Sequence, residues 1–578
     1  MKDIKVQLQK KVYNALRKTA GSNELLPENV IVENPPKPEL GDIAFPMFPY
    51  AKILKKSPAA IAVQIAEILS AEDAGNKYSP EGPYLNITLG RENIIRQAVS
   101  DAAEKKEKYG FNKARQNEKI MVEFSCPNTN KPLHLGHLRN NSIGESISKI
   151  LKFNSASVLK VNLINDRGVH ICKSMLAYRE FGSGTTPESE NIKSDHFVGK
   201  YYIEFDKWVK KNPEAEKKAR EMLLAWENGD PEVRALWSKM NKWAVDGIEE
   251  TYKKTGVSFD RVYYESRTYT SGRDEILKGI EKGVFYRDDN KTVWVDLEDI
   301  NLDKKVLLRG DGTSLYLTQD IGTAIARHID WPFDTLIYVV ASEQQYHFKV
   351  LFHILGKLGY QWAKNLYHLS YGMVNLPEGR MKSREGTVVD ADDLIAELSE
   401  MAAGEIKNKE REDDVDDVAS TAEKIALGAL NYFLLSAAPA KDMIFNPADS
   451  LSFNGNTGPY LQYMGARISS ILRKYGNTEK IKEADLTLLK LDEEWEIIKL
   501  IHEFPETVEE AGRELNPSIL ASYIYELAKK FSKYYHDYPV LNNEDKSLVL
   551  ARVALCSAVR QVFENCFSLI GIPYLDAM

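Results

Sequence analysis

The fold is decided by residues 119–152, which read KIMVEFSCPNTNKPLHLGHLRNNSIGESISKILK. Residues 120–124 form a short, mostly apolar run of strand length, and the prolines and asparagines of residues 125–132 end it. Beyond this turn, apolar residues recur at the spacing of one helix face: Ile143, Ile147, Ile150 and Leu151. Residues 157–164 then read as a second strand. The stretch therefore predicts a strand, a crossover helix and a further strand.

Two histidines, His134 and His137, stand where the predicted helix begins. In such a unit a ligand lies beyond the carboxyl end of the strand, and the helix N-terminus offers free N–H groups to a phosphate. The pair can therefore be catalytic. Without further context, however, two histidines three residues apart at a helix start are more often a capping or packing feature.

Composition narrows the class of protein. A chain of 578 residues is too long for one core and predicts three or four domains. With 43% hydrophobic and 28% charged residues and no apolar run near the ~18 residues of a membrane span, we expect a cytoplasmic protein without a secretory signal. Four scattered cysteines predict neither disulfides nor a zinc site. The net charge of -8 decides little about nucleic-acid partners.

The pattern along the chain predicts an α/β protein with a Rossmann-like parallel-sheet catalytic domain, an insertion, an N-terminal α+β module and a C-terminal all-α domain. Strand patterns at 334–340 and 366–374 and helix patterns at 61–69, 215–226 and 232–252 support this interpretation. The second half of the sheet is expected to resume around Val293. The expected domains are 1–110 (N-terminal module), 111–177 (first catalytic half), 178–290 (insertion), 291–400 (second catalytic half) and 401–578 (helical domain).

The segment His134-Leu-Gly-His137 resembles the His-Ile-Gly-His signature of class I aminoacyl-tRNA synthetases, in the strand, loop and helix context that the signature requires. Residues 379–386, GRMKSREG, are similar to a degenerate Lys-Met-Ser-Lys-Ser loop of that class. Four further stretches resemble the arginyl-tRNA synthetase family. These are residues 123–139, the two amino-acid-site segments 316–320 and 343–349, and residues 452–463 at the start of an anticodon-binding helical domain.

The resemblance implies activation of L-arginine by ATP to arginyl-adenylate, followed by transfer to the 2′-hydroxyl of the terminal adenosine of arginine tRNA. It implies that Glu123 and Asp320 bind the guanidinium, with Tyr316 alongside, and that Asn128 and Gln344 hold the backbone groups of the substrate. Two carboxylates suit a planar cation that has five donors. Without the resemblance, Glu123 reads as a strand-end carboxylate and Asp320 as a helix cap.

The resemblance also implies an ATP site, formed by His134, Gly136, His137, Met381, Lys382 and Ser383. Stabilising charge on the phosphoryl oxygens is the chemistry required, and Mg²⁺ arrives bound to the triphosphate rather than held by the protein. In this chain Ser383 aligns with the second lysine of the signature loop. Many members of the family lack that lysine and place another just before the first signature, where Lys131 stands. We expect His134, His137, Lys131 and Lys382 to be catalytic, although Lys131 can equally be a solvated loop lysine.

The predicted partners are arginine tRNA, L-arginine and ATP, with no membrane, and we expect a monomer. Tyr460 and Tyr463 can stack on anticodon bases, although aromatic residues three apart on a helix are as often core. The resemblance also implies that the N-terminal module contacts tRNA. Two competing hypotheses are a catalytically silent paralogue that binds RNA or senses arginine, and a class I synthetase for another amino acid. The intact histidines and carboxylates disfavour the first, and the amino-acid-site segments disfavour the second.

Overall fold

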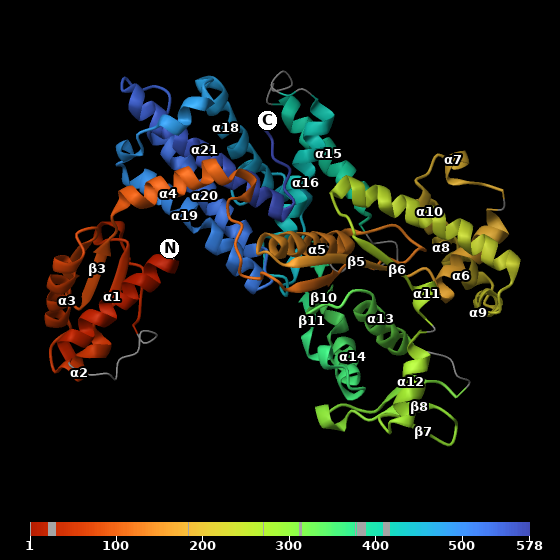
Figure 1. Ribbon diagram of the computed structural model, residues 1–578. Coiled ribbons are helices and arrows are strands. Elements are labelled where there is room, and N and C mark those ends of the chain that lie inside the picture. The colour runs from red at the N-terminus through yellow and green to blue at the C-terminus, as the bar shows by residue number, and fades with distance from the viewer. Residues whose placement is uncertain are drawn as a thin grey trace. The chain divides into compact units, whose positions relative to one another are not determined.

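The chain forms two compact units. The computed structural model describes residues 2–20, 30–182, 184–269, 271–310, 315–375, 377, 389–408, 415 and 417–578. One unit comprises residues 1–110, 468–507 and 527–562, and the other comprises residues 111–467, 508–526 and 563–578. Figure 1 labels most of the helices and many of the strands.

The N-terminal part of the first unit contains a three-stranded antiparallel sheet and several helices. The strands are β1 (Ile43–Pro46), β2 (Lys77–Glu81) and β3 (Tyr84–Thr88), in the order β1-β3-β2. The helices are α1 (Lys2–Ala20), α2 (Ala51–Leu54), α3 (Pro58–Glu72) and α4 (Arg91–Lys105). Helix α3 begins after Ser57, whose hydroxyl accepts a hydrogen bond from the Ala60 N–H, and it buries Ile61, Ile65 and Leu69. The predicted helix and strand of this module are confirmed.

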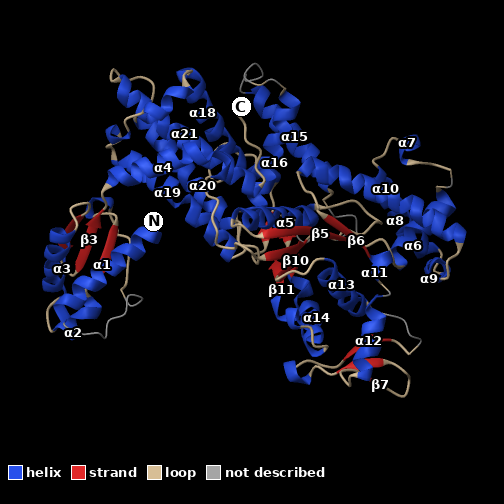
Figure 2. Ribbon diagram, viewed as in Figure 1, coloured by secondary structure: helices blue, strands red, loops and turns tan. Residues whose placement is uncertain are grey.

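The centre of the second unit is a five-stranded parallel sheet, whose strands Figure 2 shows in red beside α5. Its order is β11-β10-β4-β5-β6, formed by β4 (Lys119–Glu123), β5 (Ser157–Ile164), β6 (Arg261–Tyr264), β10 (Thr335–Ala341) and β11 (Leu366–Tyr371). Helix α5 (Leu135–Phe153) connects β4 to β5 and buries Ile143, Ile147, Ile150 and Leu151. The predicted strand, helix and strand are confirmed, and so is the predicted α/β fold with its parallel sheet.

A bundle of helices separates β5 from β6. It consists of α6 (Val169–Phe181), α7 (Pro187–Glu190), α8 (Ser194–Lys211), α9 (Glu214–Glu227) and α10 (Pro231–Thr255). Aromatic side chains such as Phe197, Tyr201 and Trp226 fill its core. This bundle has a core of its own, as expected for an insertion.

The sheet resumes earlier than the sequence pattern indicates. Strand β6 pairs with β5 from Arg261, whereas Val293, where we expected the sheet to resume, lies in a separate antiparallel sheet. That sheet has the order β7-β8-β9 and is formed by β7 (Tyr286–Arg287), β8 (Val293–Val295) and β9 (Lys305–Leu308). Because β6 is a short edge strand with no fully buried side chain, it lacks the apolar signature of an inner strand. Helices α11 (Glu265–Thr268), α12 (Ser271–Glu281), α13 (Tyr316–Asp330) and α14 (Gln345–Lys357) complete this half.

The strand expected at 366–374 is divided. β11 ends at Tyr371, and β12 (Val374–Asn375) pairs in parallel with β13 (Met443–Ile444). At the break, a Cβ on Gly372 would lie 2.5 Å from the backbone of Lys441, so only glycine allows this approach. The buried guanidinium of Arg139 donates to four carbonyl oxygens around the break, those of Gly372, Met373, Pro439 and Lys441.

The rest of the chain is helical, as predicted, apart from β13. Its helices are α15 (Ala391–Asn408), α16 (Val418–Leu435), α17 (Pro447–Ser450), α18 (Gly458–Tyr475), α19 (Asp492–Arg513), α20 (Ser518–Asp537) and α21 (Lys546–Ile570). Within the described residues, α21 is the one helix long and apolar enough to span a membrane, but 72% of its apolar window is buried in the protein. Such burial is typical of a core helix.

Candidate active site

The site is built on a sharp turn after β4. Ser125 and Cys126 both have positive φ angles, +73° and +48°, which non-glycine residues rarely adopt. Two asparagine side chains hold the turn: Asn140 accepts a hydrogen bond from the Ser125 N–H, and Asn162 accepts one from the Cys126 N–H. Such strain is typical of functional sites because the surrounding structure must stabilise it. The turn places residues 126–131 beyond the carboxyl end of the sheet.

Beyond the ends of β4 and β10 lies a cavity of about 610 Å³. All five residues expected to bind arginine line it: Glu123, Asn128, Tyr316, Asp320 and Gln344. They come from β4, the turn after it, α13 and the segment after β10, which are far apart in sequence. The structure therefore brings the whole predicted amino-acid set into one cavity, which lies where parallel α/β sheets bind ligands.

Glu123 does not face the cavity as a lone carboxylate. Its side chain is buried and forms an ion pair with the guanidinium of Arg327, whose side chain is 1% exposed. Burial raises the pKa of Glu123, and the charge of Arg327 opposes this shift. Part of the charge of Glu123 therefore serves an internal cation. No sequence pattern indicated this partner, which lies near the end of α13.

Asp320 is the more accessible carboxylate of the predicted pair. Its side chain is 35% exposed, and an oxygen lies 2.6 Å from Nε2 of His347 on α14. Tyr316, one turn earlier on α13, is 69% exposed at the rim. Asp320 is thus hydrogen bonded to an imidazole rather than paired with a permanent cation, so it can accept the donors of an incoming guanidinium.

Glu265 and His170 are among the lining residues that were not predicted. Glu265 is 6% exposed, and burial raises the pKa of its carboxyl to about 7. Within the described residues, no ion pair engages it. His170 also lines the cavity, and burial lowers its pKa to about 4. Glu265 begins the four-residue helix α11 after a polar edge strand, and neither element has a pattern that would have indicated it.

His134 and His137 cap α5 reciprocally. The N–H of Gly136 donates to Nδ1 of His134, and the N–H of His134 donates to Nδ1 of His137, each at 3.1 Å. Burial, together with the charge of Lys131, lowers the pKa of His134 to about 4. Burial, His134 and Lys131 also lower the pKa of His137 well below its usual value. Both rings are therefore neutral at pH 7. Because Nδ1 accepts in each, the ring proton lies on Nε2, which is left as a donor.

Lys131 lies between two cavities. It lines the 610 Å³ cavity and a second one of about 450 Å³, which His134, His196, Tyr202 and Asp390 also line. Burial lowers the pKa of Lys131. Lys131 is half-buried and lies beside both the predicted arginine residues and His134, and its role toward ATP stays a prediction.

Six predicted residues remain: Gly136, Met381, Lys382, Ser383, Tyr460 and Tyr463. Met381, Lys382 and Ser383 are outside the described residues. Tyr460 and Tyr463 are half-buried on α18 and line neither cavity. The ring of Tyr460 lies 6.0 Å from that of Tyr525, and the guanidinium of Arg467 lies over Tyr463 at 5.6 Å. Gly136 stands beside His134, where an added Cβ would lie 3.0 Å from the imidazole.

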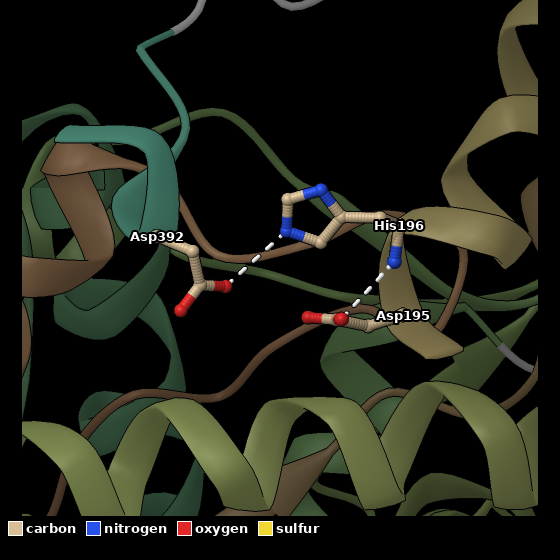
Figure 3. A group of neighbouring side chains, drawn as sticks. All are labelled: Asp195, His196 and Asp392. Atoms are coloured by element: carbon tan, nitrogen blue, oxygen red, sulfur yellow. Dashed lines mark hydrogen bonds and ion pairs between the residues drawn. The ribbon is translucent and has the colours of Figure 1, made fainter. Parts of the chain in front are cut away.

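One group of side chains within the described residues has the spacing of a metal site: Asp195, His196 and Asp392 (Figure 3). The ammonium of Lys193, however, lies 2.7 Å from Asp392 and 3.2 Å from Asp195. This cation takes the place that a metal ion would need, so the donor set does not fit a metal.

Comparisons with known proteins agree with this geometry. Residues 98–447 match the family described as "tRNA synthetases class I (R), catalytic domain". Residues 461–578 match the DALR anticodon binding domain, and residues 6–89 match the arginyl tRNA synthetase N terminal domain. The fold and the site thus define a class I aminoacyl-tRNA synthetase.

Relatives narrow the class. The chain is 56% identical to the arginine–tRNA ligase of Treponema denticola over 590 residues, covering 100% of each chain. It is 47% identical to that of Borrelia hermsii, covering 100% of this chain and 99% of the relative. The arginyl-tRNA synthetase of Thermus thermophilus has the same fold, with a TM-score of 0.80 and 27% identity over 99% of each chain. The chain belongs to the arginyl-tRNA synthetase family, and it is an enzyme.

Proposed function

We propose that the 610 Å³ cavity binds L-arginine and that ATP binds beside it at His134 and His137. The arginine carboxylate attacks the α-phosphorus of ATP, which gives arginyl-adenylate and pyrophosphate. The 2′-hydroxyl of the terminal adenosine of arginine tRNA then attacks the adenylate carbonyl, and AMP leaves. One observation carries the proposal: Glu123, Asn128, Tyr316, Asp320 and Gln344 line a single cavity that shares Lys131 with the cavity beside His134.

The charges of the cavity favour a guanidinium ligand. Glu123 already pairs with Arg327, so Asp320 and Glu265 supply the net negative charge for an incoming cation. A guanidinium stays protonated at all relevant pH values and keeps Glu265 ionised on binding. Asn128 and Gln344 can then hydrogen bond to the α-amino and carboxylate groups. Glu123 contributes indirectly, because its ion pair with Arg327 forms part of the buried wall of the cavity.

The histidines suit the developing charge on the α-phosphate. Both are neutral and each offers an Nε2–H donor, so they stabilise phosphoryl oxygens without a counter-charge that would have to be desolvated. Lys131 adds a positive charge from between the cavities. Mg²⁺ comes with ATP as part of the substrate. Met381, Lys382 and Ser383, by family resemblance, complete the ATP site from the signature loop.

We further propose the five-domain division given above, a monomeric state, a cytoplasmic location and no membrane partner. In this proposal the N-terminal module contacts the tRNA, and Tyr460 and Tyr463 stack on anticodon bases. Their half-buried rings on α18 support the second assignment, because fully buried tyrosines could not reach RNA.

The test is charging of tRNA with labelled amino acids. With ATP, Mg²⁺ and total tRNA, the protein should attach arginine, and it should not attach lysine or citrulline. Lysine has a compact ammonium and citrulline is neutral, so both fail to satisfy Asp320 and Glu265. Attachment of another amino acid would support a class I synthetase of different specificity. No attachment by the folded protein would support the catalytically silent paralogue.

A further inference from the structure

The segment that enters α15 is paired with the backbone of the first signature. The N–H of Leu135 donates to the carbonyl of Val389 at 3.1 Å, and the N–H of Ala391 donates to that of Leu133 at 3.0 Å. His134 and Asp390 form an antiparallel bridge between these bonds. The position of His134 is therefore set partly by residues 389–391, which lie far away in sequence.

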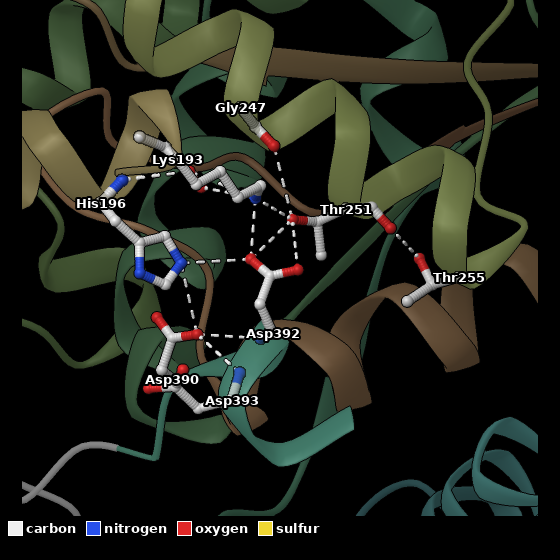
Figure 4. A network of polar contacts seen from close by, with 9 residues as sticks. Lys193, His196, Gly247, Thr251, Thr255, Asp390, Asp392 and Asp393 are labelled. Atoms are coloured by element: carbon white, nitrogen blue, oxygen red, sulfur yellow. Dashed lines mark hydrogen bonds and ion pairs between the residues drawn. The ribbon is translucent and has the colours of Figure 1, made fainter. Parts of the chain in front are cut away.

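The insertion holds the start of α15 in turn (Figure 4). Nζ of Lys193 lies 2.7 Å from an oxygen of Asp392 and 2.6 Å from the hydroxyl of Thr251 on α10. Nε2 of His196, on α8, lies 3.2 Å from Asp392 and 3.5 Å from Asp390. The same Asp390 caps α15, since it accepts hydrogen bonds from the N–H groups of the helix start.

The network contains more carboxylates than positively charged side chains. The carboxylates of Asp195, Asp390 and Asp392 face one ammonium, that of Lys193. The hydrogen bond to Asp392 raises the pKa of His196. Although burial raises the pKa of Asp392, the hydrogen bonds from His196 and Lys193 lower it to about 2. Lys193 and His196 both stabilise these carboxylates, and Thr251 supplies the contact from α10.

We propose that Lys193 and His196 are positioning residues: by holding Asp390 and Asp392 they fix the backbone of His134 where ATP is activated. Neither side chain needs to touch the substrates. This inference rests on the proposed function of His134. It assigns to the insertion a role in the activation step, because α8 and α10 hold the segment that pairs with His134.

The first experiment is a double-mutant cycle. Lys193→Ala and Asp392→Ala should each lower kcat for arginine-dependent pyrophosphate exchange about 10- to 100-fold, as expected for a displaced catalytic group, with KM values changed less than about threefold. The double variant should lose no more than the worse single variant, because both act through one contact. Additive losses, or unchanged kcat in folded single variants, would overturn the proposal.

Lys242→Ala is the matched control. Lys242 lies on α10 and pairs with Asp246 on the exposed face, so its removal deletes an ion pair of the same element without reaching α15. Its kcat should equal that of the parent. Lys193→Met tests folding, since it keeps the length of the side chain; a thermal midpoint near that of the parent together with low kcat supports positioning. If the parent itself shows no exchange, the proposed function fails rather than this inference.

The second experiment is a pH profile. The acidic and basic groups around His196 include Asp195 and Lys193 from its own segment, and Asp390 and Asp392 from the start of α15. The second cavity adds Lys131, the neutral His134, and Lys200, Glu204 and Lys207 of α8. Protonated His196 binds Asp392 more strongly, so its contribution is present below its raised pKa and is lost as pH rises through that value. kcat of the parent should fall over this window relative to His196→Gln. Parallel profiles would contradict the role of His196.

Discussion

At the scale of single residues, charge balance decides how the cavity works. Glu123, Asp320 and Glu265 bring three carboxylates to one cavity, and Arg327 neutralises the deepest of them. The motif predicted Glu123 and Asp320 as ligands, but a sequence does not show which cation is buried against which acid. Arg327 reads from sequence as one more polar residue at the end of a helix. The burial of Arg327 is the reason why we assign Glu123 to the wall of the cavity and Asp320 to the proposed guanidinium site.

We expect Asp320→Asn to raise KM for arginine about 30-fold or more, since truncating one side of a charge-assisted pair costs about 2 kcal/mol or more. KM for ATP should change less than about threefold. Asp330→Asn, at the exposed end of the same helix, is the control. Steady-state pyrophosphate exchange measures both constants, and an unchanged KM for arginine would refute the assignment of Asp320.

Glu123→Ala should lower the free energy of unfolding by about 3–5 kcal/mol, because it leaves the buried guanidinium of Arg327 without a counter-charge. The double variant Glu123→Gln, Arg327→Met should recover most of that loss, since it removes the charges together. Chemical denaturation at pH 7 measures both. A single variant as stable as the parent would mean that Arg327 has another way to satisfy its charge.

The two interpretations of His134, cap and phosphate ligand, can be separated by one substitution. Asparagine also accepts the N-cap hydrogen bond but places no ring N–H toward ATP. His134→Asn should therefore keep the stability within about 0.5 kcal/mol and lower kcat about 100- to 1000-fold. His134→Ala should lose both. Denaturation and pyrophosphate exchange on the same preparations give the answer; an active His134→Asn would leave His134 a cap alone.

At the scale of elements, apolar patterns predicted the strands and helices whose apolar residues are buried. β4, β5 and β10 contain buried apolar runs, and α5 has apolar residues at helical spacing, so all four were found from sequence. β6, β12 and β13 were missed because they are short, and hydrogen bonds to distant partners rather than apolar runs define them. The break after Tyr371 depends on Gly372 and on Arg139, an interaction that local sequence does not contain.

We expect Arg139 to stabilise the backbone around the interruption between β11 and β12. Its guanidinium is buried and donates to four carbonyl oxygens from two segments. Lysine has fewer donors and no planar fork, so Arg139→Lys should lower the free energy of unfolding by about 3 kcal/mol. Arg261→Lys, in an exposed pair with Asp330, should cost less than about 1 kcal/mol. Equal effects in denaturation would show that the carbonyl contacts contribute little.

At the scale of the whole molecule, the net charge of -8 describes no face of the protein and predicted nothing about its RNA partner. The family matches extend over an N-terminal domain, a catalytic domain and an anticodon-binding domain. In the proposed function, amino-acid chemistry takes place in one cavity of the second unit, and the first and last of these domains contact the tRNA.

The central claim is that this cavity activates arginine. The most direct measurement is arginine-dependent exchange of labelled pyrophosphate into ATP, with arginine tRNA present and with lysine as the matched control. We predict exchange with arginine and none above background with lysine. No arginine-dependent exchange from folded protein in the presence of tRNA would contradict the account.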